Sequence, residues 1–239
     1  MIPPKLIRLA PKIFVGVLLF MTLVQAVRNG DFKSFKNFNK KFSLRFYLPL
    51  LISFPIVIAC LLPFDSFFRS VLNASPWLKG ITEFGSFIGD NFKFWMIFVG
   101  IHLVLRWMKK EDWAKKFFGA VLGGAFAGLT VHLLKFVFLR ARPYVGLGPF
   151  TFFDYQGFLS DHRGFQSFPS GDVALVAGAA SYLFYSTKSR FRWLIFLLPL
   201  STALARVYLD RHWVTDTVGS IFLGLILSRL VGDYLRTEP

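Results

Sequence analysis

The sequence predicts an all-α integral membrane protein: a six-transmembrane-helix bundle with one extra N-terminal interfacial or hairpin helix. Hydrophobic residues make up 54% of the 239 residues, and 31 of them are Phe. The apolar residues form long runs and not the 3.6-residue stripe of a soluble amphipathic helix. Six runs are long enough, or nearly so, for the roughly 20 apolar residues that cross a bilayer.

The six expected crossings follow one another along the chain. They are residues 46–64, 92–107, 117–139, 173–185, 193–209 and 214–231. A seventh run, 13–27, follows a basic stretch and also has features of a signal peptide, which we expect not to be cleaved. We therefore divide the chain into an N-terminal segment with a basic link, 1–45, and a six-helix domain, 46–239.

The distribution of Lys and Arg predicts the orientation in the membrane. Of the 28 Lys and Arg residues, 16 lie in the links 28–45, 106–116 and 188–192 and in the tail from 229. These segments share one side if each of the six runs crosses once, and cytoplasmic loops are enriched in Lys and Arg. A crossing at 13–27 would put its three preceding cations on the outer side. We therefore expect this segment to lie shallowly in the interface or to form a hairpin.

Charge and cysteine content exclude several classes of protein. The net charge is +15, but the cations lie in short links between apolar runs and not on one soluble face, which argues against nucleic-acid binding. The single cysteine, Cys60, lies within an apolar run, so neither an intramolecular disulfide nor a Cys-based metal site is expected. No obligate protein partner is evident.

Three short clusters far apart in the chain carry the polar chemistry. They are KFVFLRARP at 135–143, FPSGD at 168–172 and ARVYLDRHWVTD at 205–216, each at the end of an apolar run. The two long outer segments, 65–91 and 140–169, border this site, and we expect a short helix around 79–87 in the first of them.

The first two clusters suit an anion. Lys135 and Arg142 are two helical turns apart, so both should project to one side of a helix that Pro143 ends. The guanidinium fork matches two phosphate oxygens, although either cation could instead snorkel to the headgroups. Ser170 can cap the next helix and Gly171 lets a backbone amide approach an oxyanion, although capping alone also explains the motif.

The third cluster combines Arg206 with a histidine and an aspartate. His212 and Asp216 are four residues apart, a spacing at which two side chains on a helix can hydrogen-bond. A carboxylate that accepts from one imidazole nitrogen leaves the other nitrogen unprotonated, as a nucleophile or base. The other two histidines in apolar runs, His102 and His132, are expected to be packed or hydrogen-bonded core residues.

Together these residues resemble the motifs of the type 2 phosphatidic acid phosphatase superfamily. Six residues separate Lys135 from Arg142, five separate Arg206 from His212, and three separate His212 from Asp216, as in that family. The resemblance covers about residues 85–228. It implies a six-helix core with the site at the outer membrane face, no cofactor and no metal.

The resemblance also implies a role for each matching residue. His212 would form a phosphohistidine, oriented by Asp216, and water would then release the phosphate. The groups that would bind and stabilise the phosphoryl group are Lys135, Arg142, Arg206, Ser170 and the amide of Gly171. Positioning and charge stabilisation are what phosphoryl transfer mainly requires.

Two positions depart from the family pattern. Ala205 replaces a serine, and Asp172 replaces the histidine that in the family protonates the leaving group. Three explanations remain open: Asp172 is itself a protonated acid, His162 or a water substitutes for it, or the chain is impaired. A leaving group that departs readily as an anion needs less acid assistance, which favours an anomeric phosphate or a diphosphate.

The predicted substrate is a lipid phosphate in the bilayer of the bacterial cell envelope. Within the superfamily the chain most resembles the lipid A phosphatases, and the 1-phosphate of lipid A is the preferred substrate. Undecaprenyl diphosphate and phosphatidylglycerophosphate are alternatives, as is transfer of the phosphoryl group to another lipid. A non-catalytic phospholipid-binding or transport protein is the alternative from a different class. The expected location is the bacterial inner membrane, multi-pass, with the site facing the periplasm.

Overall fold

The computed structural model describes residues 44–235, which contain α-helices, short 3-10 turns and no strand. The predicted segment 13–27 and nearly all of 1–45 lie outside the described residues. The main helices are α2 (Leu44–Leu61), α3 (Asp65–Asn73), α4 (Lys79–Ile88), α5 (Asn91–Trp107), α6 (Glu111–Phe138), α7 (Tyr155–Ser160), α8 (Gly171–Ser186), α9 (Leu197–Tyr208) and α10 (Val214–Leu235).

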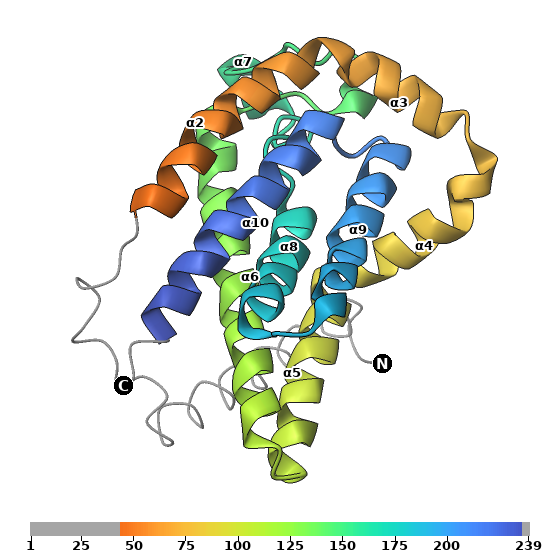
Figure 1. Cartoon of the computed structure of the whole chain (residues 1–239). Helices are drawn as coiled ribbons and strands as arrows, with labels where there is room; N and C mark the ends of the chain where they lie inside the picture. Colours follow the sequence, from red (N-terminus) through yellow and green to blue (C-terminus); the bar gives the residue numbers. More distant parts are fainter. Residues whose placement is uncertain (1–43, 236–239) are drawn as a thin grey trace, which may run out of the picture.

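The centre of the bundle is formed by α6, α8 and α10, with α9 and α5 beside them (Figure 1). These three helices approach closely where glycines face one another: a Cβ added to Gly178 would lie 2.5 Å from the backbone oxygen of Gly123, and one on Gly224 would lie 2.8 Å from the nitrogen of Gly178. Small residues allow such backbone contact between membrane helices. The close packing leaves α8 almost completely buried from Val173 to Leu183.

Each expected apolar run lies almost entirely in α-helix or 3-10 helix, which confirms an all-helical membrane architecture. Within the described residues, four helical segments are long and apolar enough to cross a membrane. A fifth span is obtained if residues 76–88, which include α4, are joined with α5, although the two segments are bent by 67° relative to each other. The buried helix α8 has 16 residues and is not among them. The six-crossing count therefore remains a prediction.

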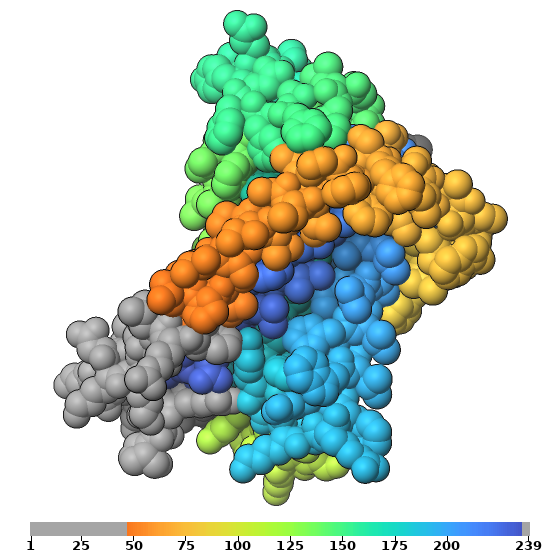
Figure 2. Space-filling model, turned by 45° about the horizontal axis from the view of Figure 1, so that its top comes forward, coloured from red at the N-terminus to blue at the C-terminus, as the bar shows by residue number. Residues whose placement is uncertain are grey.

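The outer segment 65–91 contains one helix that was expected and one that was not. The short helix expected around 79–87 is present as α4, Lys79–Ile88. The unexpected α3 continues from α2 through a short 3-10 turn. Helix α2 runs along α10, with Tyr47 hydrogen-bonded to Asp233 near the C-terminal end of α10. Helix α3 lies at the opposite end of the bundle, against the end of α9 and the start of α10 (Figure 2). This end of the bundle is also where the three sequence clusters meet.

Candidate active site

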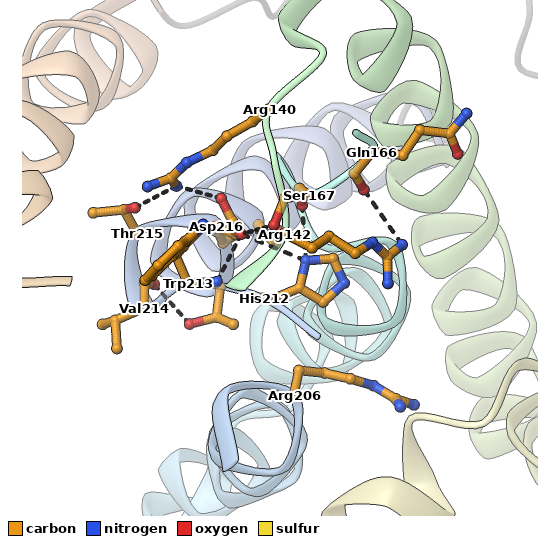
Figure 3. Close-up of polar contacts among 12 residues, drawn as sticks. Arg140, Arg142, Gln166, Ser167, Arg206, His212, Trp213, Val214, Thr215 and Asp216 are labelled. Carbon is orange, nitrogen blue, oxygen red and sulfur yellow. Dashed lines mark hydrogen bonds and ion pairs between the residues drawn. The ribbon is translucent and has the colours of Figure 1, made fainter. Parts of the chain in front are cut away.

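Four helix ends bring the three clusters together. The end of α6, the start of α8, the end of α9 and the start of α10 lie at the same end of the bundle (Figure 1). Arg142, Ser167, His212 and Asp216 lie together there (Figure 3), and Lys135 lies beside Gly171 at the start of α8. Residues more than 70 positions apart in sequence, such as Arg140 and Asp216, are in direct contact. Helix packing therefore builds one polar site from three separate clusters.

The first cluster is arranged differently from the prediction. Helix α6 ends at Phe138, because Leu139 takes a left-handed conformation with φ 41°, so Arg142 is not on the helix that carries Lys135. Arg142 is extended, as expected for a residue before proline, and its amide donates to the backbone oxygen of Gly164 at 2.8 Å. The left-handed Leu139 and the extended segment after it, and not helical periodicity, place Arg142 at the site.

The second cluster starts α8. Ser170 is the N-cap residue, but its hydroxyl does not cap the helix, which corrects the prediction. The first helical bond is donated by the Ala174 amide to Ser170, so the amides of the first turn, including that of Gly171, precede the helical hydrogen-bond pattern. They are available to an anion at the helix start.

The third cluster is a tight turn between α9 and α10. The amides of Arg211 and His212 both donate to the backbone oxygen of Arg206, at 3.0 and 3.1 Å. Asp210 takes a left-handed conformation with φ 55°, and its carboxylate accepts from Arg69 at 2.7 Å. This hydrogen bond from Arg69 holds the pKa of Asp210 below its usual value. Helix α3 thereby holds the turn that carries His212.

His212 is buried, with 2% of its surface exposed, and its Nδ1 lies 2.7 Å from the backbone oxygen of Ser167. A carbonyl oxygen only accepts, so Nδ1 carries the hydrogen and Nε2 of the neutral ring has a free lone pair. The nearest Asp216 oxygen lies 3.6 Å from Nδ1, outside hydrogen-bond distance. The direct His212–Asp216 hydrogen bond expected from the spacing is thus replaced by one to Ser167.

The environment of His212 favours the neutral ring. Burial lowers the pKa of His212 to about 4, and the positive charges of Arg142 and Lys135 act in the same direction, whereas Asp216 opposes them. In Figure 3 the nitrogen that is free of hydrogen bonds points to the side where Arg142 lies. At neutral pH this nitrogen is unprotonated and faces a cation.

Asp216 is held by a buried network that sequence reasoning missed. Arg140 donates to Asp216 at 2.5 Å and to Asp65 of α3 at 2.7 Å, and all three side chains are fully buried. Thr215 bonds to both Arg140 and Asp65, and the second Asp216 oxygen accepts from Ser167 at 2.5 Å. In the sequence, Arg140 and Asp65 look like ordinary charges near a membrane surface.

Asp172 and Arg206 form an ion pair. Arg206 Nε lies 2.9 Å from Asp172 Oδ2, with 14% and 27% of the two side chains exposed. Arg206 Nη2 also donates to the backbone oxygen of Gly89 at 3.2 Å, which connects the end of α4 to the site. A carboxylate therefore occupies part of the cationic site that the family resemblance assigns to the phosphoryl group.

Several polar groups at the site remain unused. The Ser170 hydroxyl and Arg142 Nε are buried without a hydrogen-bond partner, and Lys135, 6% exposed, forms no ion pair within residues 44–235. Buried polar groups normally have partners, so these groups are suited to bind an anion. In the described part of the chain, no cluster of His, Cys, Asp or Glu is suited to hold a metal ion.

The three remaining histidines differ in burial and in the groups that they contact. His102 is buried and hydrogen-bonds to the backbone oxygen of Ala114 at 2.9 Å, which confirms its prediction as a core residue. His162 is exposed and packs on Phe158. The prediction for His132 is wrong: the residue is exposed, and its ring lies beside Gly171 at the start of α8.

Two comparisons with known proteins found a match, one to a family and one to a solved structure. Among curated proteins, none matches the sequence. The crystal structure of Aquifex aeolicus LpxE matches with a TM-score of 0.52 and 23% sequence identity, covering 70% of this chain and 92% of that one, a likeness in fold. The model of the PAP2 superfamily matches residues 116–237, more than half of the chain. This chain belongs to the PAP2 superfamily and is a membrane phosphatase, a phosphoric ester hydrolase.

Proposed function

We propose that the protein hydrolyses a phosphate monoester or diphosphate on an envelope lipid, through a phosphohistidine on His212 and without a metal. The observation that carries this proposal is the hydrogen bond from His212 Nδ1 to the Ser167 carbonyl. It leaves Nε2 unprotonated next to Arg142, so that a phosphoryl group bound by the cations would meet a nucleophile.

The other site residues have roles in the same step. Lys135, Arg142 and Arg206 would stabilise the charge of the phosphoryl oxygens, assisted by the Ser170 hydroxyl and the Gly171 amide. As Nε2 bonds to phosphorus, the ring becomes positively charged, and Asp216 at 3.6 Å stabilises that charge. Water then attacks the phosphohistidine and releases inorganic phosphate.

The preferred substrate is the 1-phosphate of lipid A, with undecaprenyl diphosphate and phosphatidylglycerophosphate as alternatives. An anomeric phosphate has a better leaving group than an alkyl phosphate, which suits a site where the carboxylate of Asp172 is ion-paired with Arg206. We also infer six crossings of the bacterial inner membrane, with the site at the periplasmic face, from the distribution of Lys and Arg.

The test is the release of free phosphate from these three lipids in detergent micelles, by the protein as it stands and by His212→Ala and Asp172→His. We expect release by the unaltered chain and none by His212→Ala. The ion pair of Asp172 with Arg206 favours one other function, lipid binding without turnover. No release by the unaltered chain, together with unchanged lipid binding by His212→Ala, would establish that alternative.

A further inference from the structure

His132 lies beside Lys135 and the first turn of α8. It is on α6, one turn before Lys135, and it is exposed. A Cβ built on Gly171 would lie 3.7 Å from Cε1 of His132, 4.0 Å from its Nε2 and 3.8 Å from Nζ of Lys135. The imidazole and the ammonium group therefore lie together against the first turn of α8, where the phosphoryl group would bind.

The face of α6 next to His132 is directed to the lipid. Leu129, Leu133 and Phe136 are 62%, 64% and 60% exposed, as expected for side chains in contact with acyl chains. A lipid phosphate has its phosphoryl group in the cationic site and the rest of the molecule on the lipid side. The bridging oxygen would lie between the two, and His132 is on the border between the exposed face of α6 and the start of α8.

The residue at the family's acid position is engaged elsewhere. Asp172 is ion-paired with Arg206 at 2.9 Å, and an ionised carboxylate has no proton to give. His162, the other candidate donor, is exposed and packs on Phe158 of α7. Among the described histidines that are not assigned to the nucleophile or the core, only His132 is next to the start of α8.

We propose that His132 is the general acid and base of the reaction, in place of the histidine that Asp172 replaces; this assignment rests on the proposed function. In the first step the His212 Nε2–phosphorus bond forms, the bond from phosphorus to the leaving oxygen breaks, and the proton of His132 goes to that oxygen to give the alcohol. In the second step neutral His132 takes a proton from the attacking water. The His212–phosphorus bond then breaks, and phosphate leaves.

The bound phosphoryl group would decide whether His132 carries a proton. Desolvation and the positive charge of Lys135 on α6 disfavour an imidazolium at His132, whereas Asp172 on α8 favours one. A bound phosphoryl dianion stabilises an imidazolium beside it, and departure of the dianion removes that stabilisation. The ring is thus able to give a proton when substrate is bound and to accept one afterwards.

The test uses His132→Asn, with His162→Asn as the matched control. On the best lipid substrate of the panel, we expect His132→Asn to lower kcat about 10²- to 10⁴-fold with KM little changed. On 4-nitrophenyl phosphate, whose leaving group needs no proton, the loss should be less than about tenfold. The double variant His132→Asn with Asp172→His should recover activity on the lipid, because it restores an imidazole at the family position.

The outcomes distinguish this inference from the proposed function. If the unaltered chain shows no phosphate release that depends on His212, the proposed function fails. If the unaltered chain is active, two results would show that the assignment of His132 is wrong. One is that His132→Asn has the same kcat on the lipid as His162→Asn. The other is that His132→Asn loses activity equally on the lipid and on 4-nitrophenyl phosphate. If the enzyme does not turn over 4-nitrophenyl phosphate, kcat on the lipid is measured as a function of pH instead. The kcat of the unaltered chain should fall at alkaline pH, where the general acid loses its proton, and His132→Asn should not show this fall. The same alkaline fall in His132→Asn would overturn the proposal.

Discussion

His212 Nδ1 lies 2.7 Å from the backbone oxygen of Ser167, and the hydroxyl of the same Ser167 donates to Asp216 at 2.5 Å. Ser167 therefore lies between His212, the proposed nucleophile, and Asp216. Two of its groups act separately: the carbonyl determines the tautomer of His212, and the hydroxyl contacts the carboxylate.

Ser167→Ala should lower activity without abolishing it. The substitution removes the hydroxyl donor to Asp216 but keeps the carbonyl that accepts from His212. One hydrogen bond to a charged group contributes about 1.5–3 kcal/mol, so kcat should fall by about tenfold to 100-fold while the enzyme remains active. The measurement is phosphate release under saturating substrate, and a loss as complete as that of His212→Ala would contradict it.

Arg140→Gln should destabilise the fold strongly. It leaves Asp65 and Asp216, both fully buried, without their shared counter-charge. Removing one member of a buried ion pair costs about 3–5 kcal/mol. Arg69→Gln is the matched control, because its pair with Asp210 is about one-third exposed and should contribute less than about 1 kcal/mol. Thermal unfolding in detergent compares the two, and equal shifts would refute the buried network's importance.

Ser170→Ala should weaken anion binding without destabilising the protein. The Ser170 hydroxyl is buried and has no hydrogen-bond partner, so the substitution removes no intramolecular bond. Inhibition by orthovanadate, which has the geometry of the phosphoryl transition state, should weaken on the order of tenfold for the loss of one charge-assisted hydrogen bond. A lowered melting temperature with unchanged inhibition would instead indicate a structural role.

Asp172→Asn should bind anions more tightly. The carboxylate is paired with Arg206 in the cationic site and repels a phosphoryl anion. The amide removes that charge, so the inhibition constant for orthovanadate should fall, on the order of severalfold for a partly exposed charge. If Asp172 were instead the protonated general acid, the same variant would lose most of its kcat on lipid substrates.

The pKa of His212 predicts how stability changes with pH. Burial lowers it from 6.5 to about 4, so between these values the unfolded chain binds a proton at this residue that the folded protein does not. Stability is therefore unaffected by this group above pH 6.5 and decreases as the pH falls toward 4, by up to about 3 kcal/mol.

His212→Gln is the control for this effect, because glutamine does not titrate. The melting temperature of the unaltered protein should fall more steeply between pH 6.5 and 4 than that of His212→Gln. Parallel curves would mean that the folded protein protonates His212 as readily as the unfolded chain does.

The sequence by itself determined the all-helical membrane class, the short helix at α4 and the residues of the three motifs. These are local properties, because a run of apolar residues and a fixed spacing can be recognised without knowing what packs against them. Even there, helical periodicity was wrong for Arg142, since the left-handed Leu139 ends α6 first.

Only the tertiary structure decided which polar groups meet. Asp65 contacts Thr215 across 150 positions, Ser167 takes the place expected for Asp216 beside His212, and His132 is brought from an apolar run to the start of α8. The physical reason is that a charged or polar residue near a membrane surface has the same local sequence whether it faces headgroups or a buried partner. Helix packing determines the partner, and with it the chemistry that the residue can perform.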